Sequence, residues 1–370
     1  MTAAFVAPGR IVTGLGCLAS VGEEAARLGG KALLVTGRRF ARETGLTERV
    51  LTLLREAGVA SSVYDQVTPD PTLEQVEAAR RQAREGGCDL VLGLGGGSVM
   101  DAAKVVAGLA REAAPAREFQ QGRAVQRQGL PFIAVPTTAG TGAEATPNGV
   151  ITDTERRAKQ SIRDPSFMPA AAIVDPEPMR HADLTVTAHA GMDALDQAVE
   201  SHVSRHAYSL TRALSRQAVA LLSRALPRLA EDLGDMAARE DAAMGSLMAG
   251  IALANAKLGV VHGLAHPLGA RYGIPHGRVC GILMPHAIRY NAEVAAEGYA
   301  ELSEVVGRPL VDFVEETLTR FRMPSDLGEY HIPRADIPAI VAQALGAGST
   351  HANPRDVTEG DLTALLETAI

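Results

Sequence analysis

The first half of this 370-residue chain alternates short apolar runs with amphipathic segments. KALLVTG at 31–37 and CDLVLGLGGGS at 88–98 are typical of buried strands that end in glycine, and residues 72–87 repeat apolar side chains at helical spacing. Further apolar strand patterns occupy 131–138 and 171–176. Strands separated by helices predict a parallel sheet that is covered on both faces.

The strand pattern disappears after about residue 180. Alanine- and leucine-rich segments at helical spacing follow, at 190–206, 209–233, 239–257 and 354–370. A chain of this length is also long for one hydrophobic core. The sequence therefore predicts two domains, an α/β dinucleotide-binding domain at 1–180 and an all-helical, metal- and substrate-binding domain at 181–370. We expect the active site in the cleft between them.

Composition narrows the class of protein. Hydrophobic residues make up 46% and charged residues 21% of the chain, which is typical of a soluble globular protein, and the net charge of −7 argues against a nucleic-acid-binding surface. We find no apolar run long enough for a membrane span and no signal-peptide pattern at the N-terminus. Three scattered cysteines without a CxxC pair fit a reduced, cytoplasmic protein.

A glycine-rich turn lies between a predicted strand and a predicted helix, in GLGGGSVMDAAK at 93–104. Its glycines allow a ligand to approach the backbone closely, and the helix N-terminus offers free N–H groups to an anion. We therefore predict a diphosphate site here, although an ordinary strand–helix turn would have the same composition. The turn matches neither the Walker A motif nor GxGxxG.

A second polar loop, PTTAGTGAEAT at 136–146, follows the strand pattern FIAV. Thr137, Thr138 and Thr141 could hydrogen-bond phosphate, ribose or a nicotinamide amide, whereas a solvated loop is the simpler interpretation. The position of this loop at the end of a second strand favours the ligand, because the ends of neighbouring strands converge on ligands in open α/β sheets.

Histidines gather in VHGLAHPLGARYGIPHG at 261–277, where His262, His266 and His276 lie within 17 residues. Asp193 lies one helical turn before Gln197, so both side chains face the same way. One carboxylate with two imidazoles suits a divalent transition metal that keeps an open position for substrate. A structural role for the histidines is the alternative.

Five collinear motifs carry a resemblance over nearly the whole chain: GGGSVMDAAK, PTTAGTGAEAT, KQSIRDPSFMPAAAIVDPE, GMDAL and HGLAHPLGARYGIPHG. Together they resemble the iron-containing (group III) alcohol dehydrogenase family. The resemblance implies a dinucleotide-binding α/β domain joined to a helical domain, Fe²⁺ or Zn²⁺ in the cleft, and interconversion of alcohols and aldehydes with NAD(P)(H). Members are usually dimers or larger assemblies, so we expect a homo-oligomer.

The resemblance implies that Asp193, His262 and His276 are metal ligands, and that Gln197 stands where the family usually has a histidine. An amide oxygen is a weak, neutral ligand. The related glycerol dehydrogenases hold zinc with one aspartate and two histidines, whereas a metal-free enzyme like the maleylacetate reductases is the alternative. His189 is a further candidate for the missing ligand. His266 is either a proton relay or a packing residue.

The resemblance also implies which residues bind the cofactor: Gly95, Gly96, Gly97 and Ser98 at the diphosphate, Thr137, Thr138, Thr141 and Thr146 on the nicotinamide side, Lys159 near the ribose, and Asp101 within the glycine motif.

The segment LVTGRRF bears on the choice of cofactor. NAD-preferring members often carry an aspartate after VT, where this chain has Gly37 followed by Arg38 and Arg39. The loss of a carboxylate and the gain of two cations suit a 2′-phosphate, so we expect NADP(H) to be favoured over NAD(H). Two solvated arginines are the alternative.

We therefore predict an NAD(P)-dependent alcohol dehydrogenase or aldehyde reductase, in which a divalent metal polarises the substrate oxygen. A lyase like dehydroquinate synthase shares the architecture, and a catalytically idle binding protein is a further alternative. The sequence does not indicate the natural substrate.

Overall fold

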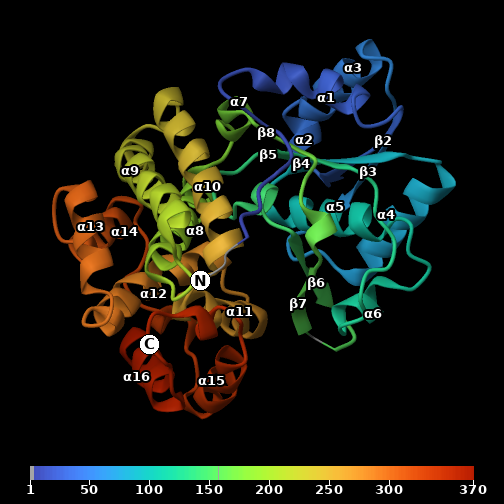
Figure 1. Cartoon of the computed structure of the whole chain (residues 1–370). Helices are drawn as coiled ribbons and strands as arrows, with labels where there is room; N and C mark the ends of the chain where they lie inside the picture. The colour runs from blue at the N-terminus through green and yellow to red at the C-terminus, as the bar shows by residue number, and fades with distance from the viewer. Residues whose placement is uncertain (1–3, 157) are drawn as a thin grey trace. The chain divides into compact units, whose positions relative to one another are not determined.

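A six-stranded parallel sheet forms the centre of the first part of the chain (Figure 1). The structure is a computed structural model that describes residues 4–156 and 158–370. It divides into two compact units. The α/β unit comprises Ala7–Thr138 and Ala143–His181, and the helical unit comprises Ala182–Ile370 with residues 4–6 and Ala139–Gly142.

The order of the strands across the sheet is β1 (Ile11–Thr13), β8 (Ala171–Val174), β5 (Phe132–Pro136), β4 (Leu90–Gly95), β2 (Lys31–Gly37) and β3 (Ala60–Val67). The four inner strands are the predicted apolar runs, and their residues are almost all buried because helices cover both faces. The edge strands β1 and β3 were not predicted, because most of their side chains are polar or exposed.

Helices lie on both faces of this sheet, as the alternating pattern predicts (Figure 1). The helices of the α/β unit are α1 (Val21–Ala26), α2 (Phe40–Glu43), α3 (Leu46–Glu56), α4 (Leu73–Glu85), α5 (Gly97–Leu109), α6 (Ala116–Gln120) and α7 (Pro176–Met179). The hairpin of β6 (Asn148–Asp153) and β7 (Ala158–Arg163) forms a separate antiparallel sheet that the sequence patterns did not predict.

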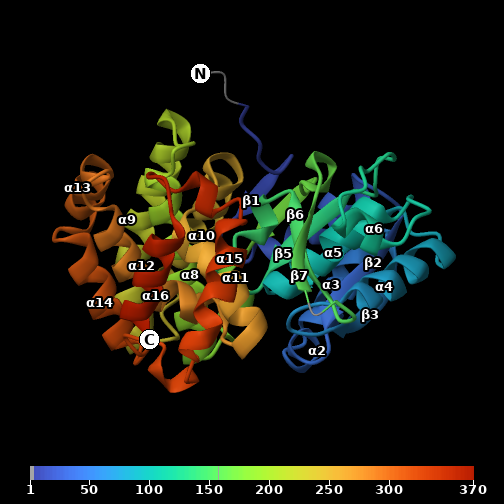
Figure 2. The same ribbon diagram turned by 90° about the horizontal axis from the view of Figure 1, so that it is seen from below.

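The helical unit contains α8 (Leu184–Val203), α9 (Ser209–Glu231), α10 (Met236–Ala256), α11 (Val260–Tyr272), α12 (His276–Asn291), α13 (Ala296–Val306), α14 (Leu310–Arg320), α15 (Ile337–Leu345) and α16 (Glu359–Ala369). Helices α8, α9 and α10 pack side by side (Figure 1), and α11, α15 and α16 lie together with α12 (Figure 2).

Helix α12 joins the two apolar cores of the helical unit. Its Met284 and Ile288 belong to the core around α8, α9 and α14, whereas Val279 and Leu283 belong to the core around α11, α15 and α16. Both α8 and α11 pack against α12, so side chains from three helices can meet at one point.

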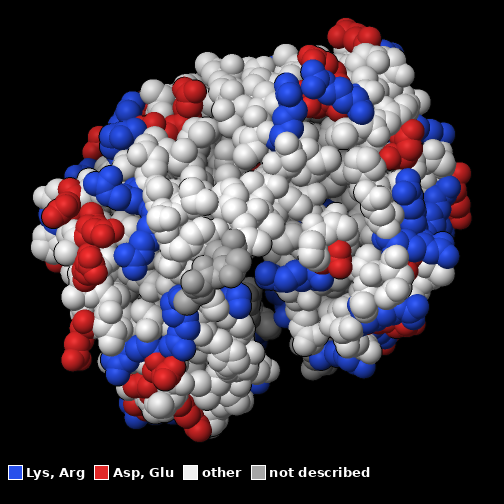
Figure 3. Space-filling model, viewed as in Figure 1, with Lys and Arg blue, Asp and Glu red and all other residues white. Residues whose placement is uncertain are grey.

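The hydropathy of the helices and the charge of the surface both bear on the sequence predictions. No single helix in the described ranges is long and apolar enough to cross a membrane, and α10 and α11 meet the length and composition criteria only as a pair bent by 103°. On the face in Figure 3, basic and acidic side chains lie beside each other. Ion pairs such as Arg228–Asp235, at 2.6 Å, join opposite charges on the helical unit.

Candidate metal centre and cofactor loops

Helix α8 buries an unusual number of polar side chains. Asp193, Asp196, Gln197 and Glu200 are each no more than 6% exposed, although α8 lies in the interior of the helical unit. Their spacing of three, four and seven residues places them on one face of the helix. Because buried charges are costly unless they are paired or bind metals, this face points to a functional site.

Three of the predicted metal ligands lie together on the described helices. The distance from Oδ1 of Asp193 to Nε2 of His262 is 3.2 Å, and from the same oxygen to Nε2 of His276 it is 3.7 Å. His262 comes from α11 and His276 is the first residue of α12. The tertiary packing of α8, α11 and α12 therefore assembles a carboxylate and two imidazoles from distant parts of the chain.

The glycine after His276 permits this approach. A Cβ atom on Gly277 would lie 2.0 Å from the backbone oxygen of His189 on α8, so only glycine fits between the two helices. His189 itself lies in neither of the clusters of potential metal ligands found among the described residues. Burial and the nearby Arg278 lower the pKa of His189.

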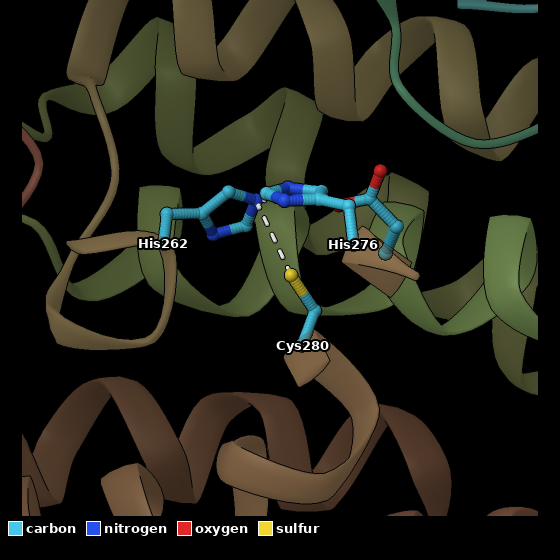
Figure 4. Close-up of side chains that lie close together, drawn as sticks. His262, His276 and Cys280 are labelled. Carbon is cyan, nitrogen blue, oxygen red and sulfur yellow. Dashed lines mark hydrogen bonds and ion pairs between the residues drawn. The ribbon is translucent and has the colours of Figure 1, made fainter. Parts of the chain in front are cut away.

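Cys280 completes the cluster, and the sequence analysis missed it. It lies one turn after His276 on α12 and is fully buried, and its Sγ is 3.9 Å from Nε2 of His262. Figure 4 shows the thiol pointing toward the two imidazole rings. One donor atom from each of Asp193, His262, His276 and Cys280 lies within 4.8 Å of all the others. The spacing of four from His276 was the available signal.

Gln197 lies one helical turn after Asp193 on α8, and its side chain is buried beside that carboxylate. Burial raises the pKa of Asp193, but His276, His262 and a hydrogen bond from the Gln197 amide together hold the pKa below its ordinary value. The Oε1 atom of Gln197 is buried and has no hydrogen-bond partner among the described residues.

Glu200 fixes the ring of His262 from the opposite side. Its carboxylate accepts hydrogen bonds from the backbone N–H groups of Gly259 and Val261 and from Nδ1 of His262, each at 2.8 Å. Two of these donors lie at the start of α11, where the helix dipole favours an anion. Because Nδ1 carries the donated proton, Nε2 faces Asp193 and Cys280, as a metal-ligating histidine requires.

Asp196 adds a second buried carboxyl group. Its Oδ2 is 3.1 Å from Nδ1 of His262 but makes no hydrogen bond, because the Nδ1 proton goes to Glu200. Burial and the neighbouring Glu200 raise the pKa of Asp196 well above its ordinary value. Neither Asp196 nor Glu200 was predicted, although both share the face of α8 that carries Asp193.

The surroundings of His262 favour positive charge. Burial alone lowers the pKa of an imidazole, but Cys280, Asp193 and Asp196 raise the pKa of His262 well above its ordinary value. The same electrostatic field favours a bound cation. The donor set of two imidazoles, a carboxylate and a thiol therefore fits a divalent transition metal.

His266 follows His262 by one turn of α11. Its ring stacks on the ring of His276, with centroids 5.3 Å apart and planes inclined by 27°. The rings of His262 and His276 meet edge to face, and their centroids are also 5.3 Å apart. His266 thus lies beside the predicted ligands, and its role as a proton relay stays a prediction.

The two predicted cofactor loops are adjacent in the α/β unit. The backbone N–H of Thr137 donates to the oxygen of Gly95 at 2.9 Å, and a Cβ atom on Gly96 would lie 3.4 Å from the Thr138 side chain. Gly97 and Ser98 form the first turn of α5, whose N–H groups have no partners within the helix.

Four further residues predicted to bind the cofactor belong to different segments of the fold. Thr141 belongs to the segment Ala139–Gly142, which groups with the helical unit. Lys159 on β7 pairs with Asp70 at 2.5 Å, and burial raises the pKa of Asp101 on α5 to about 6. Thr146 accepts a hydrogen bond from Lys104, a fully buried lysine that the sequence analysis missed.

Gly37 ends β2, and the exposed Arg38 and Arg39 follow it. Strand β2 pairs with β4, so these residues follow the strand next to the glycine-rich turn. Contact of any of these residues with a cofactor stays a prediction.

Comparison with known proteins identifies the family. The sequence model described as "Iron-containing alcohol dehydrogenase" matches residues 8–176, and the one described as "Fe-containing alcohol dehydrogenase family, C-terminal" matches residues 187–370. The chain belongs to the iron-containing alcohol dehydrogenase family. The resemblance seen in the motifs and the predicted fold class are thereby confirmed.

Relatives named for their activities cover all or nearly all of the chain. It is 32% identical over 382 residues to the NAD-dependent methanol dehydrogenase of Bacillus methanolicus, with complete coverage of both chains. It is 35% identical over 371 residues to the lactaldehyde reductase of Escherichia coli K12, with 96% of each chain covered. The crystal structure of a 1,3-propanediol oxidoreductase has a TM-score of 0.96 and 32% identity, with complete coverage of both chains.

These relatives confirm the predicted reaction class, an oxidoreductase acting on CH–OH groups, and they do not favour the lyase or the maleylacetate reductase alternative. The expected preference for NADP(H) gains no support, because the first of these relatives is NAD-dependent. Arg38 and Arg39 are both solvent-exposed side chains that follow β2.

The role of Glu200 can be tested through metal affinity. Glu200→Gln keeps the size of the side chain but replaces one acceptor oxygen with a donor, so His262 loses its fixed orientation. We expect metal affinity to fall roughly 10- to 100-fold, as for other residues that orient a ligating histidine. Competition with a chromogenic chelator measures it. Glu301→Gln, beside Nε2 of His202 at 3.0 Å, is the matched control. Equal affinities in both variants would contradict this role.

Proposed function

We propose that this protein is a metal-dependent dehydrogenase that interconverts short-chain alcohols and aldehydes with a nicotinamide dinucleotide. The observation that carries the proposal is the cluster of the buried Asp193 and His262 with the half-buried His276, in which Nε2 of His262 is directed toward the carboxylate. The relatives named for methanol, lactaldehyde and 1,3-propanediol support small, polar substrates.

Each residue of the centre has a distinct task. Asp193, His262 and His276 would hold the metal, which supplies Lewis-acid polarisation of a carbonyl oxygen. Glu200 keeps Nδ1 of His262 protonated and its Nε2 available. His266, stacked on His276, supplies the proton in aldehyde reduction and accepts it in alcohol oxidation.

The α/β unit binds the dinucleotide. The first-turn N–H groups of α5, at Gly97 and Ser98, bind the diphosphate, since a helix N-terminus attracts anions. The neighbouring Thr137 and Thr138 supply hydroxyl groups at the end of the next strand. The bound nicotinamide would supply hydride transfer to and from the substrate carbon. We further propose a homodimeric, cytoplasmic enzyme, which sedimentation and cell fractionation can test.

Turnover should depend on the metal ligands. We expect Asp193→Asn and His262→Asn each to lower kcat/KM for short-chain aldehydes at least about 1,000-fold, because several kcal/mol of charge stabilisation are lost. EDTA treatment should have a comparable effect, which added metal reverses. Asp241→Asn, which breaks only the exposed pair with Arg224, is the control. Full turnover in both ligand variants would sink the proposal and favour a metal-free reductase.

The proton-relay role of His266 has its own test. His266→Gln should lower kcat about 100-fold, because general acid–base catalysis by a side chain typically contributes a factor of this size. Metal content and cofactor affinity should stay unchanged. His286→Gln, a histidine elsewhere in the helical unit that contacts Thr368, is the matched control. An unaltered kcat and pH profile would reduce His266 to a packing residue.

Arg38 and Arg39 are proposed to let the enzyme accept the 2′-phosphate of NADPH. The double substitution Arg38→Ala with Arg39→Ala should lower kcat/KM for NADPH about tenfold, because two phosphate-pairing guanidiniums are removed. The value for NADH should change little. Arg55→Ala, an exposed arginine on α3, serves as the control. If the ratio of the two values stays constant, the arginines are merely solvated.

A further inference from the structure

The metal centre has two candidates for a fourth protein ligand. Gln197 occupies the position where the family usually has a histidine, and Cys280 brings a thiol from α12 to the same cluster. The two differ in charge and in preferred metal. An amide oxygen is neutral and binds transition metals weakly, whereas a thiolate is negative and soft.

The spacing of the donor atoms suits Cys280. For zinc bonds of about 2.3 Å to sulfur and about 2.0–2.1 Å to nitrogen or oxygen, tetrahedral geometry separates the ligand atoms by about 3.3–3.6 Å. The pairs Asp193–His262, Asp193–His276 and Cys280–His262 lie at 3.2, 3.7 and 3.9 Å. The other pairs of donor atoms lie within 4.8 Å of one another, so side-chain movements on the order of 1 Å bring all four to one centre.

The direction of the thiol provides a second argument. Nε2 of His262 faces both Oδ1 of Asp193 and Sγ of Cys280, while Nδ1 is held by Glu200. Cys280 shares a face of α12 with His276, four residues earlier, so both side chains come to the cluster from one rigid helix. Figure 4 shows this convergence of Cys280 on the two rings.

Gln197 has a different partner. Its amide contacts the Asp193 carboxylate one turn earlier on α8. Charge also separates the candidates, because Asp193 and Cys280 are at most 3% exposed. A thiolate places a second negative charge directly on the cation beside the Asp193 carboxylate, whereas an amide adds no charge.

We propose that Cys280, and not Gln197, is the fourth protein ligand of the metal centre, and that the thiolate makes the centre select Zn²⁺ over Fe²⁺. The inference rests on the metal dependence in the proposed function and deepens it. Soft sulfur ligands are typical of zinc sites, and they are disfavoured by metals that prefer oxygen.

Cobalt substitution tests the ligand directly. The full chain is stripped of metal with a chelator and loaded with Co²⁺, which takes the place of zinc. A thiolate ligand produces an intense sulfur-to-cobalt charge-transfer band in the near ultraviolet, and nitrogen and oxygen ligands do not. We expect the band in the unaltered protein and in Gln197→Ala, and its loss in Cys280→Ser. A Cys17→Ser, Cys88→Ser double variant keeps Cys280 and should retain the band.

Affinity and rescue complete the test. Cys280→Ser should weaken Zn²⁺ binding about 100-fold and Fe²⁺ binding by a much smaller factor, measured by chelator competition. Gln197→His added to Cys280→Ser should restore zinc affinity without restoring the band. Cys280→Ala provides a second variant, and circular dichroism of each variant verifies its fold.

The outcomes separate this inference from the proposed function. Cobalt that binds without the band, or a band that persists in Cys280→Ser, overturns the role of Cys280 but leaves metal dependence intact. Equal weakening of Zn²⁺ and Fe²⁺ binding in Cys280→Ser overturns the selectivity. A protein that binds no cobalt, zinc or iron overturns both the inference and the metal-dependent function.

Discussion

The carboxylate of Glu200 is the contact on which the candidate metal centre depends. It joins α8 to the first turn of α11 through two backbone N–H groups and holds Nδ1 of His262 with the same oxygens. The helix dipole of α11 stabilises this buried anion. Glu200 thus fixes both the junction of α8 with α11 and the orientation of the His262 ring. The packing of the helical unit and the geometry of the site are therefore coupled.

The buried polar side chains on one face of α8 lower the stability of the fold and indicate a functional site. Apolar residues in place of Asp193, Asp196, Gln197 and Glu200 would fill the same core without the cost of buried charge. Neighbouring groups offset that cost only partly. Among the described residues, neither the Asp196 carboxyl group nor Oε1 of Gln197 has a hydrogen-bond partner. A cation at the centre would supply the missing compensation.

Sequence patterns predicted the elements whose residues follow a regular local pattern. The inner strands β2, β4, β5 and β8 are apolar on both faces, so composition alone reveals them, whereas the half-exposed β1 and β3 and the β6–β7 hairpin have no such pattern. Asp193, His262 and His276 were predicted from motifs. Cys280 was missed because one cysteine in an apolar helix resembles any core residue, and Glu200 because its partner His262 lies 62 positions away.

By itself, the sequence determined the two-part architecture, the family and three candidate metal ligands, because periodicity and motifs are local properties of the chain. Only the tertiary structure decided which side chains accompany those three. Close packing of α12 on α8 at Gly277, and the hydrogen bond from His262 to Glu200, place the thiol of Cys280 in the cluster and leave Gln197 beside Asp193. Such contacts join residues far apart in sequence, and their geometry follows from helix packing rather than from any local pattern.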